Sequence, residues 1–177
     1  TLTLDDLSAV TVVEGDFLRV TLDQIRNVLL SLPVPLAESV SSSSALPAPL
    51  ALHRVRVAGN LVDDLGLASV EYAASHLGVP LIAVMGHTRC GAVTAATAAA
   101  DAPGRISAII AALRPSIEKA KGGHGDLVEA AARESVKSTV AALKASEPVL
   151  RPLVDRGTLR IVGMFYDIER GTVEVIS

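Results

Sequence analysis

The stretch that decides the fold reads VPLIAVMGHTRCGAV and spans residues 79–93. Its first part, Val79–Met85, is a continuous apolar run of strand length, which is typical of a parallel strand buried on both faces. A turn bracketed by Gly86 and Gly91 follows, and an alanine-rich helix is expected from there to about Ala100. This order of strand, turn and helix predicts one unit of a parallel sheet, in which ligands bind at the turn after the strand.

Further strands and helices are predicted along the chain on both sides of this unit. The alternation at residues 53–57 and the apolar runs at 159–165 and 173–176 predict strands. The apolar periodicity at 67–77 and 126–144 predicts helices. The sequence therefore indicates an α/β fold with a mainly parallel central sheet flanked by helices.

The N-terminal region differs from the rest in composition. Residues 1–51 are expected to form an N-terminal arm and a Pro/Ser-rich connector, and residues 52–177 an α/β core, within one domain overall. In the arm, a short strand is predicted at 18–20 and a helix at 21–32. The prolines and the serine run 41–44 that follow favour an extended connector.

The composition argues against several classes of partner. The net charge is −3, no cluster of Lys and Arg is present, and aromatic residues make up 2% of the chain, so nucleic-acid binding is not expected. The longest strongly apolar stretch is too short to cross a bilayer, so no membrane partner is expected either. One cysteine cannot form an internal disulfide and no secretory signal is visible, which together favour a cytoplasmic location.

Two side chains that bind metals lie on the turn after the buried strand, His87 and Cys90. Imidazole nitrogen and thiolate sulfur both bind zinc, and the N-terminus of the following helix favours the thiolate form of Cys90. Catalytic zinc normally has three protein ligands and a water, so two residues alone do not define a site. A hydrogen-bonded turn histidine beside a small buried cysteine is the alternative interpretation.

Four segments in a fixed order carry a resemblance to a known family. They are Arg56-Val57-Ala58-Gly59-Asn60, Ser69-Val70-Glu71-Tyr72-Ala73, Leu77-Gly78-Val79-Pro80-Leu81-Ile82 and Gly86-His87-Thr88-Arg89-Cys90-Gly91-Ala92-Val93. In order and spacing they resemble the β-class carbonic anhydrases, and residues 163–173 resemble the closing strands of that family. The resemblance covers residues 52–177.

This resemblance implies a function and a set of site residues. It implies reversible hydration of CO2 to bicarbonate on a zinc-bound hydroxide, with the pKa of the bound water lowered to about 7, in a protein that forms homodimers or larger homo-oligomers. His87 and Cys90 match the second and third protein zinc ligands of the family. The resembled motifs place four further residues in the pocket: Gly59, Asn60, Gly91 and Ala92.

The first zinc ligand of the family has no match in this sequence. The family carries Cys-x-Asp-Ser-Arg upstream of its Arg-x-Ala-Gly-Asn segment, with the cysteine on zinc and the Asp and Arg orienting the zinc-bound species. Counting back without gaps reaches Val34, Leu36 and Glu38 in place of Cys, Asp and Arg, and Cys90 is the only cysteine. The sequence therefore predicts an incomplete zinc site that lacks one thiolate and its outer-shell pair.

Three functions follow as hypotheses. The first is a non-catalytic or regulatory homologue with little or no CO2 hydration and no stoichiometric zinc, which serves as an assembly partner or binds bicarbonate or another small anion. The second is a zinc-dependent carbonic anhydrase whose rebuilt site adds one of four residues to His87 and Cys90: Glu38, His53, Asp63 or Asp64. The third is a metal-free enzyme with Cys90 as its nucleophile.

Overall fold

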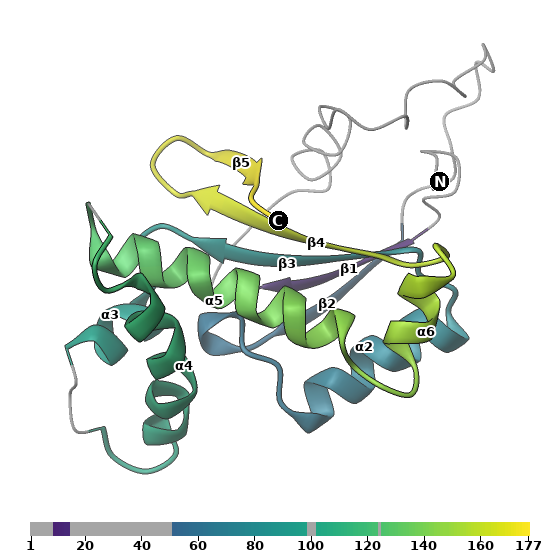
Figure 1. The fold of residues 1–177 in the computed structure, drawn as a ribbon, viewed down its shortest axis with the longest axis horizontal. Helices are drawn as coiled ribbons and strands as arrows, with labels where there is room; N and C mark the ends of the chain where they lie inside the picture. The colour runs from purple at the N-terminus through teal and green to yellow at the C-terminus, as the bar shows by residue number, and fades with distance from the viewer. Residues whose placement is uncertain (1–8, 15–50, 99–101, 124) are drawn as a thin grey trace.

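A five-stranded sheet forms the centre of the molecule. The computed structural model describes residues 9–14, 51–98, 102–123 and 125–177 (Figure 1). The strand order is β2-β1-β3-β4-β5, with bounds β1 Ala9–Glu14, β2 Ala51–Arg56, β3 Leu81–His87, β4 Arg160–Asp167 and β5 Thr172–Val175. The first four strands are parallel and β5 is antiparallel to β4. The predicted fold class, with a mainly parallel sheet, is confirmed.

Helices follow the strands and pack against the sheet. They are the 3-10 turn η1 (Ala58–Asn60) and the α-helices α2 (Asp64–His76), α3 (Gly91–Thr97), α4 (Ile106–Ala120), α5 (Leu127–Lys144) and α6 (Leu150–Asp155). Helix α5 runs along the sheet, with α3 and α4 near its first residues and α2 and α6 near its last (Figure 1). The other α-helices are therefore arranged along α5, which packs against β3 and β4.

Two glycines allow α5 to lie close against β3 and β4. A Cβ atom at Gly86 would lie 2.6 Å from Cγ2 of Val136, and one at Gly163 would lie 2.9 Å from Cγ1 of the same valine. Val136 is fully buried in the core, beside Ile82 and Val140. Any larger residue at either glycine would push the helix away from the sheet, because interiors are closely packed.

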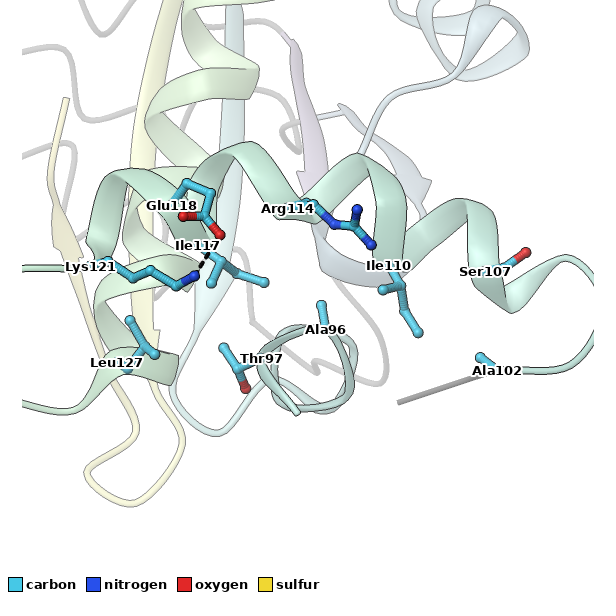
Figure 2. Close-up of a pocket in the computed structure, with 10 residues that line it drawn as sticks. All are labelled: Ala96, Thr97, Ala102, Ser107, Ile110, Arg114, Ile117, Glu118, Lys121 and Leu127. Carbon is cyan, nitrogen blue, oxygen red and sulfur yellow. Dashed lines mark hydrogen bonds and ion pairs between the residues drawn. The ribbon is translucent and has the colours of Figure 1, made fainter. Parts of the chain in front are cut away.

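A cavity of about 320 Å³ lies between α3, α4 and the start of α5 (Figure 2). Apolar side chains, among them Ile110, Ile117 and Leu127, form much of its wall. Its charged groups include Glu118 and Lys121, which form an ion pair at 2.6 Å. Neither candidate zinc ligand lines this cavity.

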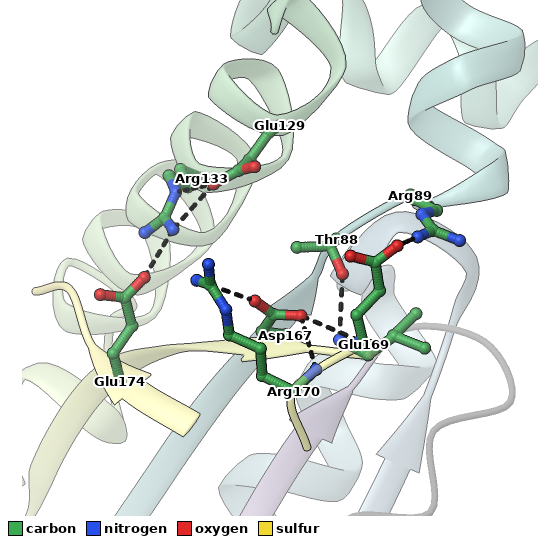
Figure 3. A network of polar contacts seen from close by, with 9 residues as sticks. Thr88, Arg89, Glu129, Arg133, Asp167, Glu169, Arg170 and Glu174 are labelled. Atoms are coloured by element: carbon green, nitrogen blue, oxygen red, sulfur yellow. Dashed lines mark hydrogen bonds and ion pairs between the residues drawn. The ribbon is translucent and has the colours of Figure 1, made fainter. Parts of the chain in front are cut away.

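Arg133 connects α5 to both C-terminal strands, and Figure 3 shows its contact with Glu174 of β5. Its guanidinium carbon lies 4.1 Å from the centre of the Phe165 ring, and its Nη2 contacts carboxylate oxygens of Glu129 at 2.9 Å and Glu174 at 2.5 Å. Burial lowers the pKa of Arg133, but its hydrogen bonds with the two carboxylates raise that pKa above its ordinary value. The guanidinium therefore stays charged between the helix and the ring.

The predicted elements differ from the observed ones mainly at their ends. The strand predicted at 79–85 is β3, shifted by two residues. Val79 does not join the sheet, since its N–H donates to the carbonyl of Ala73 in α2 at 3.1 Å. The other end continues to His87, which pairs in register with Tyr166 of β4.

Side-chain caps set the starts of two predicted helices. The helix predicted at 67–77 begins earlier, at the first residue of α2, because Oδ1 of Asp63 accepts the N–H of Gly66 at 2.8 Å. The helix predicted at 126–144 is α5, with Asp126 as its N-cap.

Three elements were not predicted: β1, α4 and α6. Strand β1 belongs to the segment interpreted as an N-terminal arm, yet it pairs with β2 on one side and β3 on the other. The strand predicted at 18–20 and the helix predicted at 21–32 lie outside the described residues, and the boundary at residue 52 stays a prediction. In the described ranges, no helix is both long and apolar enough to cross a membrane.

The close contact between α5 and the sheet predicts the cost of adding a methyl group to β3. Gly86→Ala is expected to reduce the free energy of unfolding by about 1–3 kcal/mol, because the new Cβ overlaps Val136 in a packed interior. Urea denaturation measures the change. Gly91→Ala is the matched control, since a Cβ there meets nothing within 4 Å. Equal stabilities of the two variants would contradict this account of the packing.

Candidate functional site

His87 is the last residue of β3, and its exposed fraction is 6%. Its Nδ1 lies 2.8 Å from the carbonyl oxygen of Thr88. Because a carbonyl can only accept, Nδ1 must carry the proton in the neutral ring. The buried Nε2 then holds the lone pair, which is the form of histidine that binds metals.

Cys90 is the N-cap of α3, and its exposed fraction is 4%. Burial raises the pKa of its thiol, but a hydrogen bond with the His87 side chain opposes this rise. Backbone hydrogen bonds from Val93 and Ala92, and the charge of His87 when its imidazole is protonated, also act against it, so the pKa lies below its ordinary value. The burial gives Cys90 little contact with solvent, and its use as a nucleophile stays a prediction.

The turn that holds both residues is tied to the hairpin between β4 and β5 (Figure 3). The N–H of Thr88 donates to the carbonyl of Tyr166 at 3.0 Å, and the N–H of Ile168 donates to Oγ1 of Thr88 at 3.0 Å. Arg89 forms an ion pair with Glu169 and has a left-handed backbone with φ of 54°. These contacts hold Arg89 in a backbone conformation that residues other than glycine rarely adopt.

Asn60 and Gly59, predicted in the pocket, form the turn η1 after β2 and are buried. Oγ1 of Thr139 donates to the Asn60 carbonyl at 3.2 Å, and Oγ of Ser135 donates to the Gly59 carbonyl at 3.1 Å. The Asn60 side-chain amide lies 3.4 Å from each of these hydroxyl oxygens. In this structure Asn60 therefore fixes η1 against α5. Its place in a ligand pocket stays a prediction, as does that of Gly91 and Ala92 at the start of α3.

His87 and Cys90 together fit part of a zinc site. An imidazole with its lone pair on Nε2 and a thiol with a lowered pKa are both in or near the form that zinc binds. Among the residues whose side chains the structure describes, however, no group of three or more His, Cys, Asp or Glu comes together around a metal position. Within the described part of the chain the two donors therefore supply two protein ligands, whereas catalytic zinc normally has three.

Comparison with known proteins settles the family. A family model described as carbonic anhydrase matches residues 48–173. This chain belongs to the β-carbonic anhydrase family. Carbonic anhydrase 2 of Mycobacterium tuberculosis is 36% identical over 121 residues, which are 66% of this chain and 58% of that protein. A carbonic anhydrase of Mycolicibacterium smegmatis is 36% identical over 127 residues, 70% of this chain and 62% of that protein.

Solved structures agree with this assignment at the level of the fold. One of two tetrameric β-carbonic anhydrases from Sordaria macrospora has a TM-score of 0.72 at 20% identity, covering 95% of this chain and 80% of that one. A Coccomyxa β-carbonic anhydrase in complex with acetazolamide has a TM-score of 0.69 at 25% identity, covering 94% of this chain and 71% of that one. The match to the curated relatives spans about three fifths of their length, 58% and 62% for the two named above.

The three predicted substitute ligands that the structure of this β-carbonic anhydrase homologue describes are not gathered beside His87 and Cys90. His53 lies in β2, opposite Thr11 of β1, whose partner in β3 is Ile82. That is five residues before His87, or roughly 16 Å along a strand. The carboxylate of Asp63 caps α2, and Asp64 is the first, exposed residue of that helix. Glu38 lies outside the described residues.

Sequence reasoning missed strand β1, which ends at Glu14. The register partners of Glu14 are Met85 of β3 and Arg56 of β2. Counting back without gaps puts the position of the family's first zinc ligand at Val34, which lies outside the described residues. The available signal was the valine-rich run before Glu14, which has strand composition.

The hydroxyl contacts of Asn60 predict a stability effect. Thr139→Val keeps the shape of the side chain but removes one donor and one acceptor from the buried amide and carbonyl of Asn60. The free energy of unfolding is expected to fall by about 1–3 kcal/mol, since buried polar groups lose their partner. Ser138→Ala, on the same helix with a 3.4 Å contact to Lys119, is the control. Urea denaturation compares them, and an unchanged stability of Thr139→Val would refute the role given to Asn60.

Proposed function

We propose that this chain is a β-carbonic anhydrase homologue with little or no CO2 hydration activity, in which His87 and Cys90 form a partial zinc site. The observation that carries the proposal is the pair itself. His87 and Cys90, which match the family's second and third ligands in sequence, share a hydrogen bond after β3, while the sequence has no second cysteine to act as the first. Such a chain has a non-catalytic or regulatory role and binds bicarbonate or another small anion.

The number of protein ligands explains why this ligand set supports poor catalysis. Catalytic zinc normally has three protein ligands and a water, whereas His87 and Cys90 supply two. The ligand set fixes both the affinity of the ion and the acidity of its bound water. A zinc ion with two protein ligands is also held weakly, so we expect low occupancy and a low rate together.

A second candidate is a zinc-dependent carbonic anhydrase with a rebuilt metal site. It is supported by the preparation of the two donors: the Thr88 carbonyl selects the Nε2 lone pair of His87, and the pKa of Cys90 is lowered. Outer contacts of this kind usually accompany metal ligands. Zinc held there would act as a Lewis acid that lowers the pKa of water. His87 and Cys90 would hold the ion, and a third ligand would have to complete the site.

The proposal includes assembly into a homodimer or larger homo-oligomer. The related Sordaria macrospora proteins are described as tetrameric. On this chain, α2 exposes large apolar side chains: Leu65 is 80% exposed, Tyr72 56% and the C-cap Leu77 46%. Exposed apolar groups gathered on one element favour a protein interface.

The two candidates differ in zinc content and in CO2 hydration. Protein purified without added metal or chelator is analysed for zinc, and hydration is followed by stopped flow with a pH indicator. We expect much less than one zinc per chain and a rate close to that of buffer. The Mycolicibacterium smegmatis carbonic anhydrase, a relative at 36% identity, serves as the positive control in the same assay.

Cys90→Ser is the variant that separates the two candidates. If wild-type protein carried zinc and hydrated CO2, and this change removed both, the rebuilt site would replace our first proposal. If wild-type protein lacked both, the change would alter neither.

A further inference from the structure

The cavity between α3, α4 and the start of α5 combines a buried apolar wall with an exposed cation. Ile110 and Ile117 of α4 and Ala96 of α3 line it, and each of these side chains is less than one tenth exposed. Arg114 also lines it, is exposed to solvent and lies between the two isoleucines along α4 (Figure 2). The volume of about 320 Å³ is that of a small ligand pocket. The cavity therefore suits a ligand with one polar end and one apolar end.

Arg114 has no protein partner within the described part of the chain. No ion pair, hydrogen bond or ring contact of the described residues includes its guanidinium. The other cation in the wall, Lys121, contacts Oε1 of Glu118 at 2.6 Å. The wall thus holds a closed ion pair and one guanidinium without a counter-charge.

Glu118 does not supply that counter-charge, although it follows Arg114 by one helical turn. Its Oε1 accepts a hydrogen bond from Nζ of Lys121. An arginine placed four residues before a glutamate is also the weaker of the two orders for an ion pair along a helix. The guanidinium of Arg114 is therefore available to an anion from solvent.

The hydroxyl groups of the wall do not offer hydrogen-bond donors to a ligand. Oγ1 of Thr97 donates to the carbonyl of Thr94 at 2.8 Å, and Oγ of Ser107 donates to the carbonyl of Gly104 at 2.8 Å. Each hydroxyl has one hydrogen, so both are already used. Recognition of an anion in this cavity falls to Arg114.

We propose that this cavity binds a small aliphatic monocarboxylate, with the carboxylate on the guanidinium of Arg114 and the hydrocarbon chain against Ile110 and Ile117. A planar guanidinium donates two parallel N–H bonds to a carboxylate, which is the strong and directional form of such a contact. One cation without a counter-charge matches a ligand with one negative charge. Each CH2 group buried against the isoleucines adds about fourfold in affinity. The inference goes beyond the proposed function, because neither His87 nor Cys90 lines the cavity.

Titration of the 15N-labelled chain with hexanoate, followed by its amide NMR signals, tests the proposal. Hexanol keeps the hydrocarbon chain without the charge, whereas acetate and bicarbonate keep the charge without the chain. We expect hexanoate to shift the signals of Ala96, Thr97 and Ile117 and to bind at least about tenfold more tightly than each of the other three. Equal affinities for hexanoate and hexanol, or for hexanoate and acetate, would overturn the proposal.

Substitution of Arg114 tests the contact with the carboxylate. Arg114→Gln removes the charge and should lower the affinity for hexanoate about tenfold or more, and Arg114→Lys keeps the charge without the planar fork and should lose less. Arg105→Gln is the matched control, because it removes the same charge from the N-cap of α4, outside the cavity wall. Circular dichroism checks that each variant is folded. An unchanged affinity in Arg114→Gln, or an equal loss in the control, would overturn the role of Arg114.

Cys90→Ser separates this inference from the proposed function. It should leave the affinity for hexanoate unchanged, since Cys90 does not line the cavity. A loss of hexanoate binding in this variant would place the anion at the pair of His87 and Cys90 and overturn the inference. Zinc content and CO2 hydration are measured on the same protein, so the proposed function and the carboxylate site can each fail alone.

Discussion

The contact between α5 and the sheet is the constraint on which the other parts of the structure depend. Gly86 and Gly163 let Val136 reach the backbone of β3 and β4. With the helix at this depth, its hydroxyl groups meet η1, and Arg133 reaches the ring of Phe165. Helix α5 therefore contacts η1, β3 and β4 around the end of β3. The turn that carries His87 and Cys90 is thus positioned by packing that lies outside the site.

Backbone contacts, together with the hydrogen bond between His87 and Cys90, determine the chemistry of the site. The Thr88 carbonyl selects the protonated nitrogen of His87, and backbone N–H groups at the start of α3 help to lower the pKa of Cys90. Such contacts survive the replacement of a distant ligand, because they depend on the turn and the helix alone. A chain can in this way keep two prepared donors after its ligand set has changed.

Sequence patterns predicted the parts of the fold that have a strong local signal. The apolar run of β3 and the periodic face of α5 were recognised. The observed start of β3 differs from the predicted one because the N–H of Val79 donates to α2 and not to a neighbouring strand. Helix α4 was missed because it carries a proline, Pro115, in its interior. His87 and Cys90 were found by their spacing and residue type, whereas the roles of Thr88 and Asn60 depend on partners far away in the sequence.

The pairing of β1 with β2 shows why gapless counting is a weak guide to residues at this edge of the sheet. Parallel strands are joined by crossover connections whose length is weakly constrained, because closing a longer loop costs little additional free energy. Residues 15–50 separate β1 from β2 in the sequence, yet the two strands are paired over six consecutive positions. Register is set by the sheet and stays fixed when the connection changes. The end of β1 therefore keeps its distance from His87 while its sequence separation from the Ala58-Gly59-Asn60 turn varies, and strand order is a better guide than gapless counting to which residues lie at this edge of the sheet.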